Sequence, residues 1–158
     1  MSPVIVVECD NDELLLRLLG VPRKRIRHEG NREEVVKHVL KQDPKLFVGL
    51  IDEDPGTTHG HQRRSFKNGV DRYGVLRAAH GERQLVVLRP TLEGWLIAAV
   101  HACGGRMSAL DKGLSDDRYQ LHRQFSPRGD QRMKKVVAYL QKKGSKHLVE
   151  LRKALAKD

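Results

Sequence analysis

The chain has few of the residues that stabilise a small fold by covalent or aromatic means. It contains two cysteines, Cys9 and Cys103, and only 4% of its 158 residues are aromatic. Two cysteines so far apart form neither a zinc-ligand spacing nor a disulfide framework, which predicts a reducing, cytoplasmic setting. Because aromatic side chains are scarce, the core has to consist mainly of Leu, Val and Ile.

Long apolar runs are also absent. No run approaches the roughly 20 residues that a membrane-spanning helix needs, so no membrane partner is expected. Met1-Ser2-Pro3 leads directly into a short apolar segment, without the longer apolar stretch of a secretory signal. The length fits one domain by the usual prior of roughly 100–200 residues, and no linker, repeat or low-complexity tract divides the chain. We therefore predict a single domain over residues 1–158.

Acidic residues are scarce in the second half of the chain. Residues 1–60 contain 9 Lys and Arg and 11 Asp and Glu, a net charge of −2. Residues 61–158 contain 21 Lys and Arg and 9 Asp and Glu, a net charge of +12, which brings the whole chain to +10. A basic segment of this size favours a polyanionic partner, and nucleic acid is the commonest one. The alternative is a basic surface that only faces solvent.

Short aliphatic runs alternate with amphipathic stretches in the first half. Strands are predicted over 3–8, 24–28 and 46–51. Helices are predicted over 12–19, capped by Asp10 or Asn11, and from Gly30-Asn31 to Asp43-Pro44. Helices between successive strands predict parallel pairing with right-handed crossovers. The fold class is therefore α/β, with a mostly parallel central sheet flanked by helices.

The second half is predicted to contain a loop, two strands and then helices. The expected segments, in chain order, are a loop over 55–73, strands over 74–79 and 84–88, a helix from Thr91 to Gly104-Gly105, an irregular polar region over 106–128, a helix from Asp130 to about 143 and a last helix from Gly144-Ser145 onward. Residues 106–158 would thus be a basic helical extension to a core of about 3–103. The apolar stripes of the last two helices either close this core or form a homodimer interface.

Acidic residues end two of the apolar runs. The run at 4–7 is followed by Glu8, and the run at 46–51 is followed by Asp52, Glu53 and Asp54. In open α/β sheets the functional crevice lies outside the carboxyl ends of the strands. Carboxylates at that edge make an oxygen-rich site suited to Mg²⁺ or Mn²⁺. The alternative is that Asp merely favours the turns that end strands, but two such runs together favour a metal site.

The order of these motifs resembles the Toprim domain, which is shared by topoisomerases, bacterial primases, overcoming-lysogenization-defect (OLD) family nucleases and small RNA-maturing nucleases. Residues 6–12 stand at the place of the family's Glu turn after strand one, and residues 49–54 at its Asp-x-Asp turn. Residues 88–99 and 144–146 look like the later Glu-bearing and Lys-bearing segments of OLD-type nucleases. Cys9 stands where the family usually has Gly, and no Gly-rich phosphate loop of an ATPase half is present.

The resemblance implies a metal-dependent nuclease with Mg²⁺ or Mn²⁺ as cofactor. Asp52 and Asp54 would hold one ion, and Glu8 would be a second ligand or a general acid or base. Glu93 would complete a second metal position, although a Glu in the first helical turn also suits the helix dipole. Lys146 would be catalytic, stabilising negative charge in the transition state. Otherwise Lys146 is one more solvated lysine.

Other acidic and basic residues near these motifs receive simpler assignments. Asp10 and Asp12 are expected to cap a helix, with an outer-shell role in metal binding as the alternative, and Glu53 is expected to be exposed. The spacing of His59 and His61 does not match a zinc site. Four residues after the Asp pair are predicted to contact nucleic-acid phosphates, which brings affinity without sequence specificity. They are Arg63, Arg64, Lys67 and Arg72.

Three functional classes follow from these patterns. The leading one is a metal-dependent nuclease that cleaves DNA or RNA. The second is a non-catalytic Toprim-like module that binds nucleic acid and relies on a partner ATPase or nuclease, which Cys9 and the missing ATPase half favour. The third is a small-molecule phosphatase on a similar sheet, which would not need the charge of +12 over residues 61–158.

Overall fold

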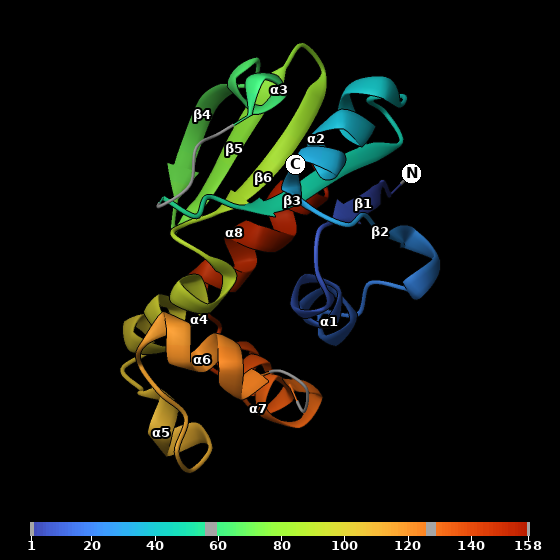
Figure 1. The fold of residues 1–158 in the computed structure, drawn as a ribbon. Helices are drawn as coiled ribbons and strands as arrows, with labels where there is room; N and C mark the ends of the chain where they lie inside the picture. The colour runs from blue at the N-terminus through green and yellow to red at the C-terminus, as the bar shows by residue number, and fades with distance from the viewer. Residues whose placement is uncertain (1, 56–59, 126–128, 158) are drawn as a thin grey trace.

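A single six-stranded sheet organises the fold (Figure 1). The computed structural model describes residues 2–55, 60–125 and 129–157. The strands are β1 (Val4–Val7), β2 (Ile26–His28), β3 (Phe47–Asp52), β4 (Lys67–Arg72), β5 (Val75–His80) and β6 (Arg83–Leu88). Their order across the sheet is β2-β1-β3-β6-β5-β4. β2, β1, β3 and β6 are parallel, and β5 and β4 pair antiparallel at one side. The prediction of an α/β fold with a mostly parallel sheet is confirmed.

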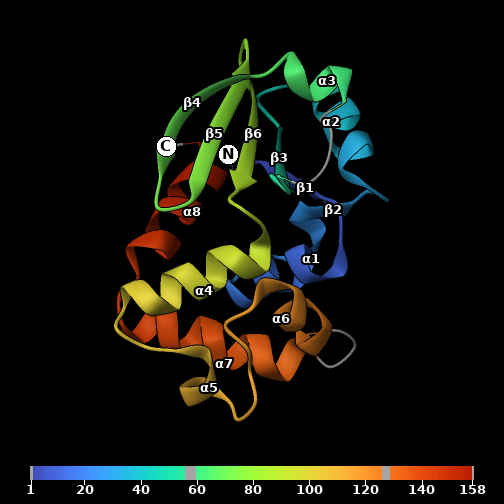
Figure 2. The ribbon, with the colours of Figure 1, turned by 60° about the vertical axis from the view of Figure 1, so that its left-hand side comes forward.

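Helices cover both faces of this sheet. They are α1 (Asp10–Leu18), η1 (Arg23–Arg25), α2 (Arg32–Lys41), α3 (His61–Arg64), α4 (Leu92–Ala102), α5 (Met107–Leu110), α6 (Arg118–Phe125), α7 (Gly129–Lys142) and α8 (Lys146–Leu155). α2 packs on one face through Val35, Val36 and Val39. α1, α4, α7 and α8 share the core of the opposite face, and Figure 2 shows α4, α5, α6 and α7 grouped beside one end of the sheet.

The strand order reverses between β1 and β3. The chain runs from β1 through α1 to β2 on one side, and then through α2 to β3 on the other side. α1 and α2 lie on opposite faces of the sheet, because their apolar residues belong to different core clusters. Such a reversal opens a crevice at the carboxyl ends of the two strands, which is where ligands bind in open α/β sheets.

Two regions expected to be irregular are folded. The predicted loop at 55–73 contains α3 and β4, with residues 56–59 outside the described part. Every residue of β4 is exposed, so no hydrophobic alternation marks it; its pairing with β5, with a register shift between Asn68 and Asp71, creates the strand. The region 106–128 contains α5 and α6.

Helix starts agree with the sequence at α2, α4 and α8, but not at α1, and α7 begins at Gly129, so Asp130 lies inside it and not at its cap. The Thr91 and Ser145 side chains cap α4 and α8, accepting hydrogen bonds from Gly94 N and Leu148 N. The predicted cap by Asp10 or Asn11 is wrong, because α1 begins at Asp10 and Cys9 occupies the capping position without a side-chain hydrogen bond.

The apolar stripes of the last two helices close the core. The buried side chains that α7 and α8 contribute are Met133, Val136, Val137, Leu140, Leu148, Leu151, Ala154 and Leu155. They belong to the same cluster as Ile5 and Val7 of β1, so they are not left for a homodimer interface. None of the helices in the described ranges is long and apolar enough to cross a membrane.

The contact of α2 with β3 requires glycine at position 49. A Cβ there would lie 2.6 Å from Leu85 Cδ2 and 3.0 Å from Val39 Cγ2. We expect Gly49→Ala to lower the free energy of unfolding by about 1–2 kcal/mol through overpacking. Urea unfolding measures this. Gly30→Ala, whose added Cβ meets nothing within 4 Å, is the control and should stay within about 0.5 kcal/mol of wild type. Equal stability of both variants would contradict the packing.

Candidate metal centre and its pocket

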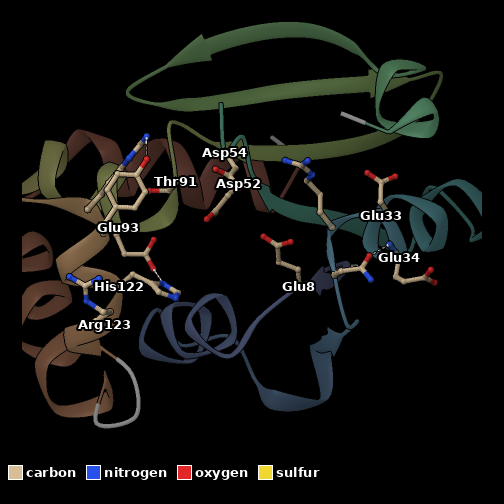
Figure 3. Close-up of a pocket in the computed structure, with 13 residues that line it drawn as sticks. Glu8, Glu33, Glu34, Asp52, Asp54, Thr91, Glu93, His122 and Arg123 are labelled. Carbon is tan, nitrogen blue, oxygen red and sulfur yellow. Dashed lines mark hydrogen bonds and ion pairs between the residues drawn. The ribbon is translucent and has the colours of Figure 1, made fainter. Parts of the chain in front are cut away.

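Carboxylates gather at the crevice between β1 and β3. Glu8 follows β1, Asp52 ends β3 with Asp54 just beyond it, and Glu93 lies in the first turn of α4, which follows β6. β1, β3 and β6 are neighbours and parallel, so their carboxyl ends meet at one edge of the sheet. Figure 3 shows these four side chains around the same space. The structure therefore brings all four predicted metal ligands together.

The space is a pocket of about 720 Å³ with walls of opposite charge. Its acidic lining consists of Glu8, Glu33, Glu34, Asp52, Asp54 and Glu93. Its other lining residues are Asn31, Arg32, Thr91, Arg118, Tyr119, His122 and Arg123. Arg118, Tyr119, His122 and Arg123 come from α6. A pocket that combines a carboxylate cluster with arginines suits a ligand carrying both a cation and a phosphate.

The turn after β3 places Asp54 beside Asp52. Asp54 has a φ of 48°, in the left-handed region that Asp tolerates better than most residues. The turn is held to the end of β6, because Glu53 N donates to Leu88 O and Asp54 N donates to Pro90 O, both at 2.9 Å. Both aspartates therefore line the pocket. Glu53 is not exposed as expected: its carboxylate pairs with the Arg89 guanidinium at 2.5 Å.

Burial and mutual repulsion destabilise the charged forms of these carboxylates. Burial raises the pKa of Glu8; Arg32 opposes this, and Asp54 and Glu93 add to it. Burial also raises the pKa of Asp52 well above its usual value, with the charge of Asp12 next in importance. The backbone amide of Leu92, at the start of α4, partly offsets that rise. Among the described residues, Oδ1 of Asp52 is buried without a hydrogen-bond partner.

Asp12 is a buried member of the same cluster. It is fully buried, and neither carboxylate oxygen has a well-aligned hydrogen-bond partner among the described residues. Burial, reinforced by the charges of Glu8 and Glu93, raises its pKa to about 7, while the nearby Cys9 thiol and amide lower it. Asp12 is not the N-cap of α1, because Cys9 holds that position and Asp12 lies in the first turn of the helix. Asp12 follows Glu8 by four residues. This short separation from Glu8 is the sequence signal that would have placed Asp12 near the carboxylate cluster.

Glu93 has a partner inside the pocket. Its buried carboxylate lies 2.7 Å from Nδ1 of His122, a residue of α6. Its position in the first turn of α4 also suits the helix dipole. Glu93 therefore connects α6 to the carboxylate cluster, and only part of its hydrogen-bonding capacity is left for an ion.

The donor set fits a hard divalent cation by chemistry. Glu8, Asp52 and Asp54 offer carboxylate oxygens, the ligand type that Mg²⁺ and Mn²⁺ prefer. Burial raises the pKa values of Glu8 and Asp52, and one Asp52 oxygen has no hydrogen-bond partner among the described residues, so the negative charge of their ionised forms is only partly compensated. A cation would compensate it.

Ligand spacing singles out a different group. Within the described ranges, the group with three ligand atoms within 4.8 Å of one another is Asp10, Glu13 and His28. It lies beside the pocket on α1 and β2, and it is largely exposed. Exposed acidic groups of this kind are common without a metal, so the group is not diagnostic. The four predicted ligands do not reach this spacing in the structure.

Lys146 lies away from the pocket. It is the first residue of α8 and lines a separate hollow with Tyr73, Cys103 and His147. The sequence order that suggested its catalytic role does not bring it to the carboxylates. The role assigned to it therefore has no geometric support in this structure.

The four predicted nucleic-acid contacts also lie outside the pocket. Arg63 is only 6% exposed and donates to Oδ1 of Asn68 at 3.0 Å. Arg64, Lys67 and Arg72 are exposed on α3 and β4. The basic residues that do line the pocket, on α2 and α6, were not singled out in the sequence. The mixed composition of 106–128 offered no pattern that would have separated them from other charged residues.

Comparison with known proteins gives no match. No family model, no curated protein and no solved structure is similar to this chain. Its function therefore has to be inferred from the site.

Proposed function

We propose that the protein is a Toprim-type nuclease that uses Mg²⁺ or Mn²⁺ to cleave phosphodiester bonds. One observation carries the proposal: four carboxylates, Glu8, Asp52, Asp54 and Glu93, line one pocket at the point where the strand order reverses, facing arginines of α6. The order of Glu turn, Asp-x-Asp turn and Glu-bearing helix along the chain supports the Toprim assignment.

Cleavage of a phosphodiester requires an activated water and neutralisation of the negative charge that develops on the phosphate. A bound Mg²⁺ or Mn²⁺ supplies both when present. Asp52 and Asp54 would hold the ion from the end of β3. Glu8 is suited to accept or donate a proton, because burial raises its pKa above the usual value of a carboxyl group. Positive charge toward the phosphate would come from arginines that line the pocket, since Lys146 lies elsewhere.

A second candidate is a non-catalytic module that binds nucleic acid for a partner ATPase or nuclease. The position of Lys146 outside the pocket favours it, because the charge-stabilising lysine implied by the resemblance is not at the carboxylates. No three of the four carboxylates offer oxygens that all lie within 4.8 Å of one another, which points the same way.

A cleavage assay separates the two candidates. Purified protein is incubated with supercoiled plasmid, single-stranded DNA and structured RNA in Mg²⁺, Mn²⁺ or EDTA. We expect cleavage of at least one substrate with either metal and none in EDTA, because the carboxylates need the cation to approach a phosphate. Intact substrates in every condition, with salt-sensitive binding retained, would favour the binding module; cleavage that persists in EDTA would contradict the metal mechanism.

A further inference from the structure

α6 presents one polar face to the pocket. Leu121 and Phe125 are buried in the core and fix the orientation of the helix. The pocket-lining residues of α6 are Arg118, Tyr119, His122 and Arg123. Their spacing of one helical turn places them on one side of the helix. In Figure 3, His122 and Arg123 lie on the side of the pocket away from Glu33 and Glu34.

Hydrogen bonds hold this face in place relative to the carboxylates. Nδ1 of His122 lies 2.7 Å from the Glu93 carboxylate, which joins α6 to the start of α4. The Asp117 carboxylate accepts the backbone N–H of Tyr119 at 2.8 Å and of Gln120 at 3.2 Å, which caps the first turn of α6. The N-terminal half of α6 is thus fixed beside the site.

Tyr119 is an exposed aromatic residue within this charged face. It is 64% exposed, the largest fraction among the exposed large hydrophobic residues of the described chain. The guanidinium carbon of Arg118 lies 4.9 Å from the centre of its ring, and Nη2 of Arg118 donates to its hydroxyl at 2.9 Å. An aromatic ring beside a cation is the combination with which proteins stack a nucleic-acid base next to its phosphate.

We infer that α6 binds a single-stranded segment of the substrate, with one unpaired base stacked on Tyr119 and the adjoining phosphates near Arg118 and Arg123. The inference rests on the proposed nuclease function for the class of its ligand. The charges are complementary: arginines on α6 attract the phosphates, while the carboxylates across the pocket repel them unless a cation is bound. A phosphate beside α6 therefore lies at the edge of the metal site.

The stacking position explains why the strand has to be unpaired. In a duplex both faces of a base are covered by its stacked neighbours, so no face is free for a protein side chain. Unpaired bases in single strands, loops or frayed ends have free faces, and aromatic side chains bind them there. DNA and RNA strands share this chemistry, so both serve as probes.

Binding of short oligonucleotides tests the role of Tyr119. Fluorescence anisotropy is measured in EDTA with 12-nucleotide single-stranded DNA and RNA and with a blunt duplex of the same sequence. We expect Tyr119→Ala to weaken single-strand binding about 10-fold, the scale of losing one stacked base, and to leave duplex binding unchanged. Tyr119→Phe keeps the ring and should bind within about twofold of wild type. An equal loss for strand and duplex, or no loss, would overturn the inference.

Paired arginine variants test the position of the phosphates. Arg118→Gln with Arg123→Gln removes two charges from α6, and Arg64→Gln with Arg72→Gln removes two exposed charges from α3 and β4. We expect only the α6 pair to reduce the salt dependence of single-strand binding, by about 1.4 in the slope of log K against log salt. A reduced slope only in the α3 and β4 pair would place the strand elsewhere and overturn the inference.

These binding measurements test the role of α6 separately from the proposed nuclease activity, because EDTA removes any metal-dependent cleavage. If metal-dependent cleavage is observed but Tyr119→Ala binds single strands as well as wild type, the role of α6 is overturned and the proposed nuclease function is retained. Tyr119-dependent binding without cleavage on any substrate would support the role of α6 and favour the non-catalytic module.

Discussion

Replacing Asp52 by asparagine is expected to lower metal-dependent cleavage about 1000-fold, the scale on which removal of one electrostatic group at a reacting centre acts. Asp52 ends β3, lines the pocket and has a buried Oδ1 without a partner among the described residues. Asparagine has nearly the same shape, and its carbonyl oxygen can still accept the Leu92 amide, so the fold should remain. The measurement is the initial rate of cleavage at saturating Mg²⁺.

A matched variant removes the same charge far from the pocket. Glu82 is exposed in the turn between β5 and β6, and Glu82→Gln should cleave within about twofold of wild type. Nucleic-acid binding in EDTA should survive in Asp52→Asn, because one repulsive carboxylate has been removed. An unchanged cleavage rate in Asp52→Asn would contradict a catalytic metal site at this edge of the sheet.

Asp12→Asn is expected to stabilise the protein in EDTA at pH 8, by about 2–3 kcal/mol in the free energy of unfolding. A pKa of about 7 instead of 3.8 corresponds to a penalty on the order of 4 kcal/mol for the ionised buried group, at about 1.4 kcal/mol per pKa unit. Asparagine avoids the buried charge, but its buried amide lacks partners. This costs part of the stability gained by removing the charge. Urea unfolding in EDTA measures the difference.

The same carboxylate makes a pH-dependent contribution to the stability of the wild type. Its folded pKa is above its unfolded value, so the folded state binds the proton more tightly. In EDTA the contribution of Asp12 to the stability should therefore be most favourable below about pH 4, fall as the pH rises from about 4 to 7, and level off above that. Asp52 and Glu8 act in the same direction, because burial raises their pKa values as well.

The control for Asp12 lies on the same helix. The Asp10 side chain is 94% exposed, and Asp10→Asn should change the stability by no more than about 0.5 kcal/mol at either pH. Asp12→Asn should lose most of its advantage at pH 4, where Asp12 of the wild type is protonated. If Asp12→Asn were less stable than wild type at pH 8, the prediction would be wrong, because the charge of the buried Asp12 carboxylate would then be stabilised in the folded protein.

The parts of the fold that follow from hydrophobic pattern were predictable from the sequence. The runs at 4–7 and 47–51 are buried on both faces of a parallel sheet and therefore read as strands. Glu8 and Asp52 converge because β1 and β3 are adjacent and parallel, which the alternation of strands and helices in the first half implied. The parallel pairing of β6 with β3, which brings Glu93 to the same edge, was not implied, because β6 follows β5 through a tight turn. β4 was not predictable, since all of its side chains are exposed and its pairing with β5 alone defines it.

The missing parts of the site depend on tertiary packing. Asp12 resembles a helix-capping residue in sequence, and only the packing of α1 against the sheet shows that it is buried. α6 reaches the pocket because Leu121 and Phe125 join the core beside α4, a contact between segments with no common sequence pattern. Lys146 shows the opposite case, in which a matching motif order did not bring the side chain to the site.

The outermost strand of the sheet has a consequence for self-association. In the described part of the chain β4 has no strand on its outer side, and an unpaired strand edge is a template on which a second copy of a chain can add a strand. Here the edge carries Lys67 and Arg72, and the register shift between Asn68 and Asp71 interrupts its regular backbone. Charges and irregularities of this kind discourage edge-to-edge aggregation. The basic residues of β4 thus have a protective role that requires no nucleic acid.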